Sequence, residues 1–430
     1  MSKAAFYTLG CKVNQYETEA ICELFKKAGY EIVQYEDFAD VYVINTCTVT
    51  AMSDRKSRQI IRRAKKRNPN AVVVATGCYA QTNPEAVAEI EGVNLIVGTD
   101  DRKRIVELCD SIKPGEQRSC VGDIMKQHEF EGLSVTECHD RTRAYIKIQE
   151  GCNQFCSYCI IPYARGPVRS RDLEDVIRET KILADNGYTE VIYTGIHVAS
   201  YGMDKGKPLL AELLRRADKT DGIRRIRLSS IEPMTLNAEF IREVKACTKL
   251  CAHFHLSLQS GCDETLRRMN RKYSTAEYEK IVDGLRENFP GAAVTTDIMT
   301  GFPGETDEEF EKTLEFVRKI RFADAHIFQY SPRKGTPAAK RTDQVSPQLK
   351  ESRSRQLIEL CAKTRDEFIS SFKGKSLEVL FERKKDSGVY EGKTSNYITV
   401  EVKSEKPLAG TYQNVVIYDE KDGIAFGRIE

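Results

Sequence analysis

Three cysteines lie within eight residues in the middle of the chain, directly after a run that is typical of a β-strand. The run is Ala144–Gln149, and Cys152, Cys156 and Cys159 follow it with the spacing Cys-x3-Cys-x2-Cys. A disulfide pairs thiols two at a time, whereas an iron–sulfur cluster accepts several thiolates from one short loop. Three ligands to a four-iron cluster would leave one iron open for a substrate or cofactor. A zinc site or a chance cluster is the alternative.

The size and composition are those of a soluble protein with more than one domain. The chain has 430 residues, of which 40% are hydrophobic and 30% charged, and this length exceeds what one compact core usually holds. No apolar run approaches membrane-spanning length, and the N-terminus lacks the pattern of a signal peptide. We therefore expect a cytoplasmic protein without membrane contact, in which the 14 cysteines stay reduced. The net charge of +2 indicates no particular partner.

The first part of the chain alternates apolar strands with helices, which is typical of a parallel sheet covered on both faces. The predicted strands are Ala5–Leu9, Val41–Ile44 and Ala71–Ala75, with a helix over 15–28. One cysteine follows each strand: Cys11, Cys47 and Cys78. Ligands of such sheets bind beyond the carboxyl ends of the strands, so we expect these thiols to converge as a second three-cysteine set. The alternative is that they pack as small hydrophobes.

A strongly basic helix is predicted between Cys47 and the third strand. Over Asp54–Arg67 eight basic residues accompany one acid, and the apolar positions share one face. The candidates for contact with RNA phosphates are Arg58, Arg62 and Lys66. A solvated surface is the alternative.

From residue 139 to about 369 the strand–helix pattern repeats six times. The predicted strands are Ala144–Gln149, Glu190–Thr194, Arg224–Ser229, His253–Leu258, Val294–Thr300 and Ala325–Tyr330. Six such units predict a complete or partial barrel, whose chemistry belongs at the carboxyl ends of the strands. The cysteine loop follows the first of these strands, where the site should be.

Several strand ends carry groups suited to a polar cofactor. The candidates are Thr194 and Gly195 after the second strand, Ser230 and Glu232 after the third, Gln259 after the fourth, and Tyr158 in the cysteine loop. The remaining cysteines, and His253 and His255 on the fourth strand, are interpreted as packing or incidental residues.

The last part, from about residue 370, changes character. Leu377–Phe381, Tyr397–Val402 and Gln413–Tyr418 alternate or run apolar between turns that contain glycine, which predicts a small antiparallel β-barrel. The predicted organisation is an N-terminal domain over 1–112, a linker over 113–138, a barrel over 139–369 and a C-terminal domain over 370–430.

These motifs resemble one family over essentially the whole chain, the radical S-adenosylmethionine (SAM) methylthiotransferases. Further similar stretches are Gly166–Arg171, Leu258–Gly261 and Gly301–Thr306. The resemblance implies a radical SAM barrel, a C-terminal TRAM domain, SAM and two 4Fe–4S clusters. Cys152, Cys156 and Cys159 would hold the SAM-cleaving cluster, and Cys11, Cys47 and Cys78 the auxiliary one. An electron donor such as flavodoxin or ferredoxin is also implied.

The residues around the first cysteine resemble one subgroup of this family. Thr8–Glu19 is similar to enzymes that modify C2 of N6-threonylcarbamoyladenosine at position 37, in the anticodon stem-loop of tRNA. The alternatives are the subgroup for isopentenyladenosine in tRNA and the one for an aspartate of a ribosomal protein. A hypothesis from another functional class is an iron–sulfur protein that binds RNA as a redox sensor and has no catalytic turnover.

Overall fold

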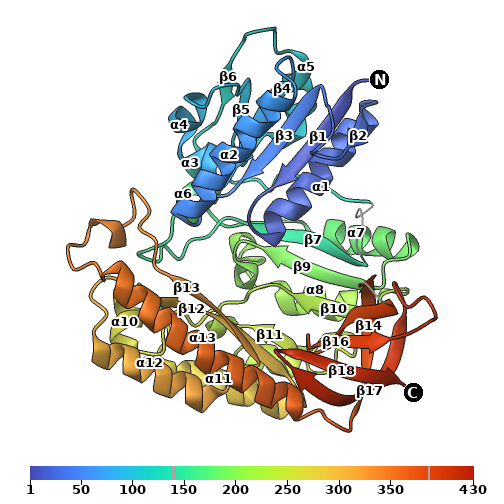
Figure 1. Ribbon diagram of the computed structural model, residues 1–430, viewed down its shortest axis with the longest axis vertical. Coiled ribbons are helices and arrows are strands. Elements are labelled where there is room, and N and C mark those ends of the chain that lie inside the picture. The colour runs from blue at the N-terminus through green and yellow to red at the C-terminus, as the bar shows by residue number, and fades with distance from the viewer. Residues whose placement is uncertain (137–141, 386–387) are drawn as a thin grey trace.

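The computed structural model describes residues 1–136, 142–385 and 388–430. Its N-terminal part is built on a six-stranded parallel sheet (Figure 1). The strands are β1 (Lys3–Thr8), β2 (Glu31–Val33), β3 (Val41–Thr46), β4 (Val72–Gly77), β5 (Leu95–Val97) and β6 (Arg118–Cys120), in the order β2-β1-β3-β4-β5-β6. The predicted parallel sheet is confirmed. β1, β3 and β4, which precede the three cysteines, are direct neighbours in it.

Helices cover both faces of this sheet, and a separate apolar core fills each side. The helices are α1 (Lys12–Lys27), α2 (Ala51–Arg67), α3 (Cys78–Thr82), α4 (Pro84–Ala88) and α5 (Ile105–Asp110). Ile60, Ile61 and Ala64 are the buried apolar side of the basic helix α2, as its periodicity predicts. The side chain of Thr50 caps the helix by accepting a hydrogen bond from the backbone of Ser53.

The segment predicted as a linker over 113–138 contains regular structure. Its residues 118–120 form β6, which pairs with β5, and Leu133 and Val135 are buried in the core of the following part. Strands of three residues are too short to show a periodicity in the sequence. Cys120 lies in β6. Cys138, interpreted as incidental, lies outside the described residues.

In the described residues, the central part has six parallel strands in two sheets that curl together into an open half-barrel, so the predicted partial barrel is confirmed. The strands are β7 (Arg143–Glu150), β9 (Glu190–Gly195), β10 (Arg225–Leu228), β11 (His253–His255), β12 (Ala293–Thr300) and β13 (Asp324–Gln329), with β8 (Arg169–Ser170) antiparallel at the edge. Isolated β-bridges, Ile226 to Leu250 and Ile231 to Leu256, join the sheet that contains β7, β9 and β10 to the sheet that contains β11, β12 and β13. The fourth strand ends at His255, three residues earlier than Leu258, and beyond it the pairing continues as isolated bridges at Leu256 and Gln259.

Helices pack around the outside of this half-barrel. They are α7 (Leu173–Asp185), α8 (Leu210–Ala217), α9 (Ala238–Val244), α10 (Asp263–Arg268), α11 (Thr275–Asn288), α12 (Asp307–Ile320) and α13 (Pro347–Ser370). The short helix α6 (Ile161–Arg165) instead lies beside α3 of the N-terminal part (Figure 1). Two of the outer helices begin with a reciprocal capping box, Ser274 with Glu277 and Thr306 with Glu309. These caps fix where α11 and α12 start, and so where the loops at the barrel mouth end.

The C-terminal part is a closed five-stranded barrel, which confirms the predicted β domain. Its strands are β14 (Ser376–Lys384), β15 (Val389–Thr394), β16 (Thr399–Lys403), β17 (Tyr412–Lys421) and β18 (Ile424–Ile429), in the order β14-β15-β16-β18-β17. The pairing of β16 with β18 is parallel, so the barrel is not purely antiparallel. The domain docks on the half-barrel, where Arg225 donates to the carbonyls of Lys393 and Glu378.

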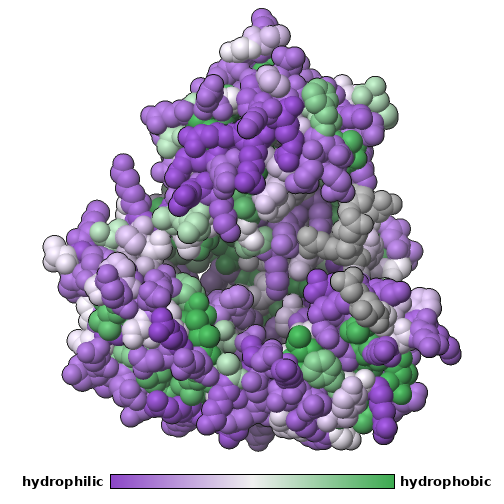
Figure 2. All heavy atoms as spheres, viewed as in Figure 1, coloured by the Kyte–Doolittle hydropathy of each residue, from purple (hydrophilic) through white to green (hydrophobic). Residues whose placement is uncertain are grey.

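The three parts surround a hollow that is visible below the N-terminal part in the space-filling view (Figure 2). The N-terminal part lies above β7 in Figure 1, and the C-terminal barrel lies beside β10. Through the described residues, every helix is too short or too polar to cross a membrane.

Candidate active site at the mouth of the barrel

The loop with the central cysteines is held tightly at the carboxyl end of β7. Gly151 has φ +73°, and a Cβ there would lie 1.9 Å from the carbonyl oxygen of Pro167, so only glycine fits. The amide of Cys152 donates to Gly166 O at 3.0 Å, and the amide of Ser157 to Met269 O at 3.0 Å. Backbone hydrogen bonds therefore hold the loop in place at Cys152 and at Ser157.

The structure brings Cys152, Cys156 and Cys159 together. Cys152 and Cys159 are half-buried, Cys156 is 8% exposed, and Cys152 and Cys159 each interact electrostatically with Cys156. Burial raises the pKa of Cys152 to about 11 and that of Cys159 to about 12. Only the thiolate binds a metal, so ligation here must displace protons.

Arg271 is the cation of this cysteine set. Its Nη1 lies 3.6 Å from Cys156 Sγ, and its Nη2 donates to Ser257 O at 3.0 Å. Nη2 is also 4.0 Å from Glu232 Oε1. Burial raises the pKa of Glu232, and Arg271 acts in the opposite direction. The sequence reasoning missed Arg271, because the residue lies 112 positions after Cys159 in the chain and only the fold brings it to the loop.

The predicted cofactor residues lie at the ends of neighbouring strands. The hydroxyls of Ser230 and Ser257 are 2.8 Å apart, and Gln259 has φ +68°. Gln259 Oε1 and Ser229 Oγ are buried without a hydrogen-bond partner in the described part of the chain. Unsatisfied buried oxygens at a strand end are what a polar ligand would bind.

Three other predicted cofactor residues have structural neighbours of their own. Thr194 is buried at the end of β9. A Cβ on Gly195 would lie 2.9 Å from Gln149 Oε1, so the close approach that this glycine allows is made by Gln149. The ring of Tyr158 packs edge-on against Phe302 at 6.5 Å. Their role in cofactor binding stays a prediction.

The N-terminal cysteines follow three adjacent strands whose ends are tied together. The amide nitrogen of the Asn14 side chain donates to Leu9 O at 2.7 Å and to Thr46 O at 3.1 Å. The hydroxyl of Thr46 donates to Thr76 O at 2.5 Å. These bonds join the ends of β1, β3 and β4, and they fix the places from which the cysteines start.

Cys11, Cys47 and Cys78 are brought together as the sequence predicts. Each thiol interacts electrostatically with at least one of the others, and burial raises the pKa of Cys47 and Cys78. Cys11 is exposed, whereas Cys47 and Cys78 are buried. Gly10 leaves the space between them, because a Cβ there would lie 2.9 Å from Cys47 Cβ and 3.0 Å from its Sγ.

The thiol chemistry of both sets is compatible with an iron–sulfur cluster. In the described ranges, no group of three His, Cys, Asp or Glu side chains is arranged to hold one metal ion. A four-iron cluster attaches each thiolate to a different iron, so its ligands need not converge on one point. Two sets of three thiols, each with an arginine that lowers the pKa of one of its cysteines, are consistent with that requirement.

Arg165 joins the two cysteine sets. It ends α6, directly after the barrel cysteine loop, and its Nε lies 3.1 Å from Cys78 Sγ. Burial raises the pKa of the Cys78 thiol, and Arg165 lowers it. The barrel therefore contributes a cation to the N-terminal set.

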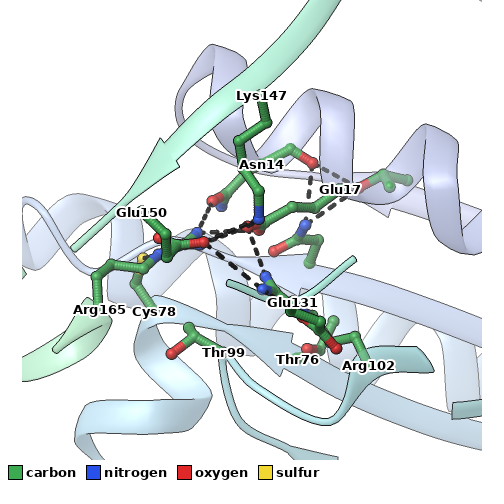
Figure 3. A network of polar contacts seen from close by, with 12 residues as sticks. Asn14, Glu17, Thr76, Cys78, Thr99, Arg102, Glu131, Lys147, Glu150 and Arg165 are labelled. Carbon is green, nitrogen blue, oxygen red and sulfur yellow. Dashed lines mark hydrogen bonds and ion pairs between the residues drawn. The ribbon is translucent and has the colours of Figure 1, made fainter. Parts of the chain in front are cut away.

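A buried ionic network holds Arg165 in place (Figure 3). Arg165 Nη1 lies 2.6 Å from Glu17 Oε1 and 3.2 Å from Glu150 Oε1. Lys147 binds the same two carboxylates at 3.0 and 2.9 Å, and Arg102 binds Glu17 at 2.6 Å. Burial opposes ionisation of Glu17, but the three cations hold its pKa well below the usual range. Because each charge has partners, the network can be buried and stay ionised.

A second set of contacts docks the Cys47 loop on the barrel. Arg333, in the loop after β13, donates to the hydroxyl of Thr48 at 2.7 Å and to Asp54 Oδ2 at 2.5 Å. The amide of Ala51 donates to the hydroxyl of Ser331 at 3.3 Å. With Arg165 on one side and Arg333 on the other, the N-terminal cysteines are docked against the mouth of the barrel.

The basic face of α2 is partly available to a ligand. Arg62 and Lys66 are exposed, and no hydrogen bond or ion pair of theirs is found within the described residues. Arg58 is half-buried and donates to the hydroxyl of Tyr79 at 3.1 Å. Asp54, the acid of this helix, is bound by Arg333. RNA contact by this face stays a prediction.

Comparison with known proteins agrees with this site. Residues 146–317 match the model of the radical SAM superfamily, and residues 3–98 match the uncharacterized protein family UPF0004. Among solved structures, the radical SAM methyltransferase TsrM of Kitasatospora setae has a TM-score of 0.59 at 18% identity, covering 79% of this chain and 74% of that one. At this identity the likeness supports the fold alone.

Curated relatives match almost from end to end. A threonylcarbamoyladenosine tRNA methylthiotransferase of Bacillus subtilis is 45% identical over 97% of this chain and 94% of its own, and one of Aquifex aeolicus is 44% identical over 88% and 92%. A tRNA-2-methylthio-N(6)-dimethylallyladenosine synthase of Alkaliphilus oremlandii is 36% identical over 96% and 89%. With its barrel, its two cysteine sets and these relatives, the chain belongs to the radical SAM methylthiotransferase family.

Proposed function

We propose that this protein transfers a methylthio group to C2 of N6-threonylcarbamoyladenosine at position 37 of tRNA. The observation that carries the proposal is a contact between the two three-cysteine sets: Arg165, which ends the helix after the barrel cysteine loop, is hydrogen-bonded to Cys78 of the N-terminal set. One set suits the cleavage of SAM, and a second set beside it suits the delivery of sulfur.

The protein residues have separable tasks in this proposal. Cys152, Cys156 and Cys159 would hold one 4Fe–4S cluster and leave an iron open for SAM, while Cys11, Cys47 and Cys78 would hold the other. When bound, these groups supply the radical, the sulfur and the methyl group, which side chains alone do not provide. The barrel orients the reactants and keeps water away from the reacting carbon.

The barrel also offers side chains for the rest of SAM. Gln259 and Ser229 have buried oxygens without hydrogen-bond partners among the described residues, and Glu232 lies beside Arg271 at the same edge. Thr194, Gly195, Ser230 and Tyr158 complete the proposed SAM-binding set. Carboxylate and hydroxyl groups at a strand end are suited to the hydroxyls of a ribose.

The choice of substrate rests on the relatives and on the N-terminal motif. The relatives named for threonylcarbamoyladenosine are 44–45% identical, against 36% for the one named for dimethylallyladenosine. Both names specify tRNA, which favours tRNA over a ribosomal protein. A redox sensor without turnover would need neither the second cysteine set nor the face of polar strand ends.

Arg58, Arg62 and Lys66 of α2 are proposed to meet the backbone of the anticodon stem-loop. They lie on the domain that carries the sulfur-delivering set, so the contact would place the target base near it. A flavodoxin or ferredoxin is the proposed electron donor. The location is proposed to be cytoplasmic, because tRNA is the substrate.

The test is to follow the product with three substrates. Anaerobically reconstituted protein, SAM and a chemical reductant are incubated with an anticodon stem-loop carrying N6-threonylcarbamoyladenosine, with one carrying isopentenyladenosine, and with a ribosomal-protein peptide. Nucleoside and peptide mass spectrometry then detect the methylthio group. We expect it on the first substrate. A methylthio group on the second or third substrate instead would overturn the assignment.

A further inference from the structure

Tyr397 of the C-terminal domain reaches into the concave face of the half-barrel. Its ring stacks on His253 of β11, with centroids 4.5 Å apart and planes 8° apart. The guanidinium of Arg143 on β7 lies 5.6 Å from the ring centroid, and that of Arg227 on β10 lies 4.9 Å from it. Side chains from β7, β10 and β11 can contact the same ring only if they all point to the inside of the half-barrel. The Tyr397 ring therefore lies in the interior of the half-barrel.

The same interior continues upward towards the cysteines. Thr295 Oγ1 is 3.0 Å from both His253 Nε2 and His255 Nδ1, and His255 Nε2 is 3.0 Å from Asp297 Oδ2. Lys12, the residue after Cys11, interacts electrostatically with Tyr397 and Asp297. The polar interior therefore extends from the C-terminal domain to the first cysteine of the N-terminal set.

In the part of the chain that the structure describes, two lysines of this interior lack the carboxylate partners that its arginines have. Arg143 is 2.9 Å from Glu382, and Arg227 is 2.7 Å from Glu190. By contrast, across residues 1–136, 142–385 and 388–430, neither Lys12 nor Lys393 has a carboxylate within ion-pair distance. Lys393 lies 4.7 Å from the Tyr397 ring and donates to the hydroxyl of Thr399.

The field in this interior is positive. Burial raises the pKa of Tyr397, but Arg143, Lys12 and Lys393 more than offset this and leave its pKa below the ordinary value. His253 stays neutral, because burial lowers its pKa well below the usual range. A buried surplus of positive charge favours an anionic ligand.

We propose that Lys12, supported by Lys393 and the cations around Tyr397, binds the carboxylate at the end of the substrate's N6-threonylcarbamoyl group. This inference rests on the proposed function. The carboxylate is several bonds from the carbon that reacts, so its binding site belongs beside the cysteine sets, and Lys12 adjoins Cys11. A dimethylallyl group in the same place would leave the lysines desolvated without a partner, which discriminates against it.

The test compares two anticodon stem-loops that differ in one group, the acid and its threoninamide analogue. Dissociation constants are measured by fluorescence anisotropy with the reconstituted protein. Wild type should bind the acid about 10- to 100-fold more tightly, as expected for a hydrogen bond to a charged group. Lys12→Gln should remove this preference and Lys12→Arg should retain it. Lys219→Gln, at an exposed position just after α8, is the matched control.

Each other outcome has a definite meaning. Equal binding of acid and amide by wild type would overturn the carboxylate site while leaving the proposed function intact. Equal weakening of both stem-loops in Lys12→Gln would assign Lys12 to a phosphate instead. If Lys12→Gln loses iron, Lys393→Gln serves in its place, since it lies on the C-terminal domain, and an unchanged preference there would count against the proposal. If wild type methylthiolates neither stem-loop, the proposed function itself fails.

Discussion

Arg165 Nε donates a hydrogen bond to Cys78 Sγ across 3.1 Å, and Arg165 lies only six residues after Cys159. The helix that follows the loop of one cysteine set therefore ends with the residue whose side chain contacts the other set. A hydrogen bond to a thiolate ligand is one of the factors that set the potential of an iron–sulfur cluster. The contact thus ties both the position and the electronic properties of the N-terminal set to the barrel.

The first prediction concerns this contact. In a protein with Cys152, Cys156 and Cys159 changed to Ala, Arg165→Met should reduce the iron retained after reconstitution, because it removes the cation beside Cys78. The pKa of Cys78, which Arg165 lowers, should rise, so the thiol of the metal-free protein should be alkylated more slowly. Iron assays and mass spectrometry measure both effects. Arg104→Met, at an exposed arginine paired with Glu107, is the control, and equal behaviour of the two variants would contradict the prediction.

The second prediction separates the cysteine sets. Two 4Fe–4S clusters give about eight irons per chain, and replacing either set with Ala should leave about four. Loss of Cys152, Cys156 and Cys159 should also abolish the formation of 5′-deoxyadenosine from SAM. Loss of Cys11, Cys47 and Cys78 should spare that reaction and stop methylthiolation. Normal product from the second variant would remove the N-terminal set from the mechanism.

The third prediction concerns RNA binding by α2. If Arg62 and Lys66 each meet a phosphate, changing both to Gln should flatten the slope of log affinity against log salt by about two units on a duplex, and by less on a loop. Arg58→Gln alone should change it less, because that guanidinium is bonded to Tyr79. Lys219→Gln with Lys245→Gln removes the same charge elsewhere on the surface. An unchanged slope in the α2 variant would leave the helix as a solvated face.

The fourth prediction is a pH dependence. Burial places the pKa of Cys152 at about 11 and that of Cys159 at about 12, so the thiolate fraction of the metal-free protein increases with pH throughout the neutral range and beyond. Alkylation of both should be slow at pH 8 and rise by about tenfold per pH unit up to pH 10 or so. N-acetylcysteine is the reference. A rate that levels off near pH 8 would contradict the prediction, because it would show that the pKa of these thiols is not raised by burial.

The sequence predicted the parts of the site that depend on local pattern. A strand followed by a cysteine is visible in the chain, and the rule for parallel sheets brings Cys11, Cys47 and Cys78 to one edge. Arg165 and Arg271 could not be found this way, because their roles depend on which loops meet in three dimensions. The charged Lys147 and Glu150 within an apolar strand were a signal for the ionic network, since buried charges in a strand need partners.

The ionic network also limits how this protein can vary. Glu17 comes from the N-terminal domain, whereas two of its cationic partners, Lys147 and Arg165, come from the barrel. A chimera that joined this N-terminal domain to a barrel lacking those cations would bury an uncompensated carboxylate, at a cost of about 3–5 kcal/mol. We therefore expect an exchange of domains between relatives to give a stable protein only when Glu17, Lys147 and Arg165 are inherited together.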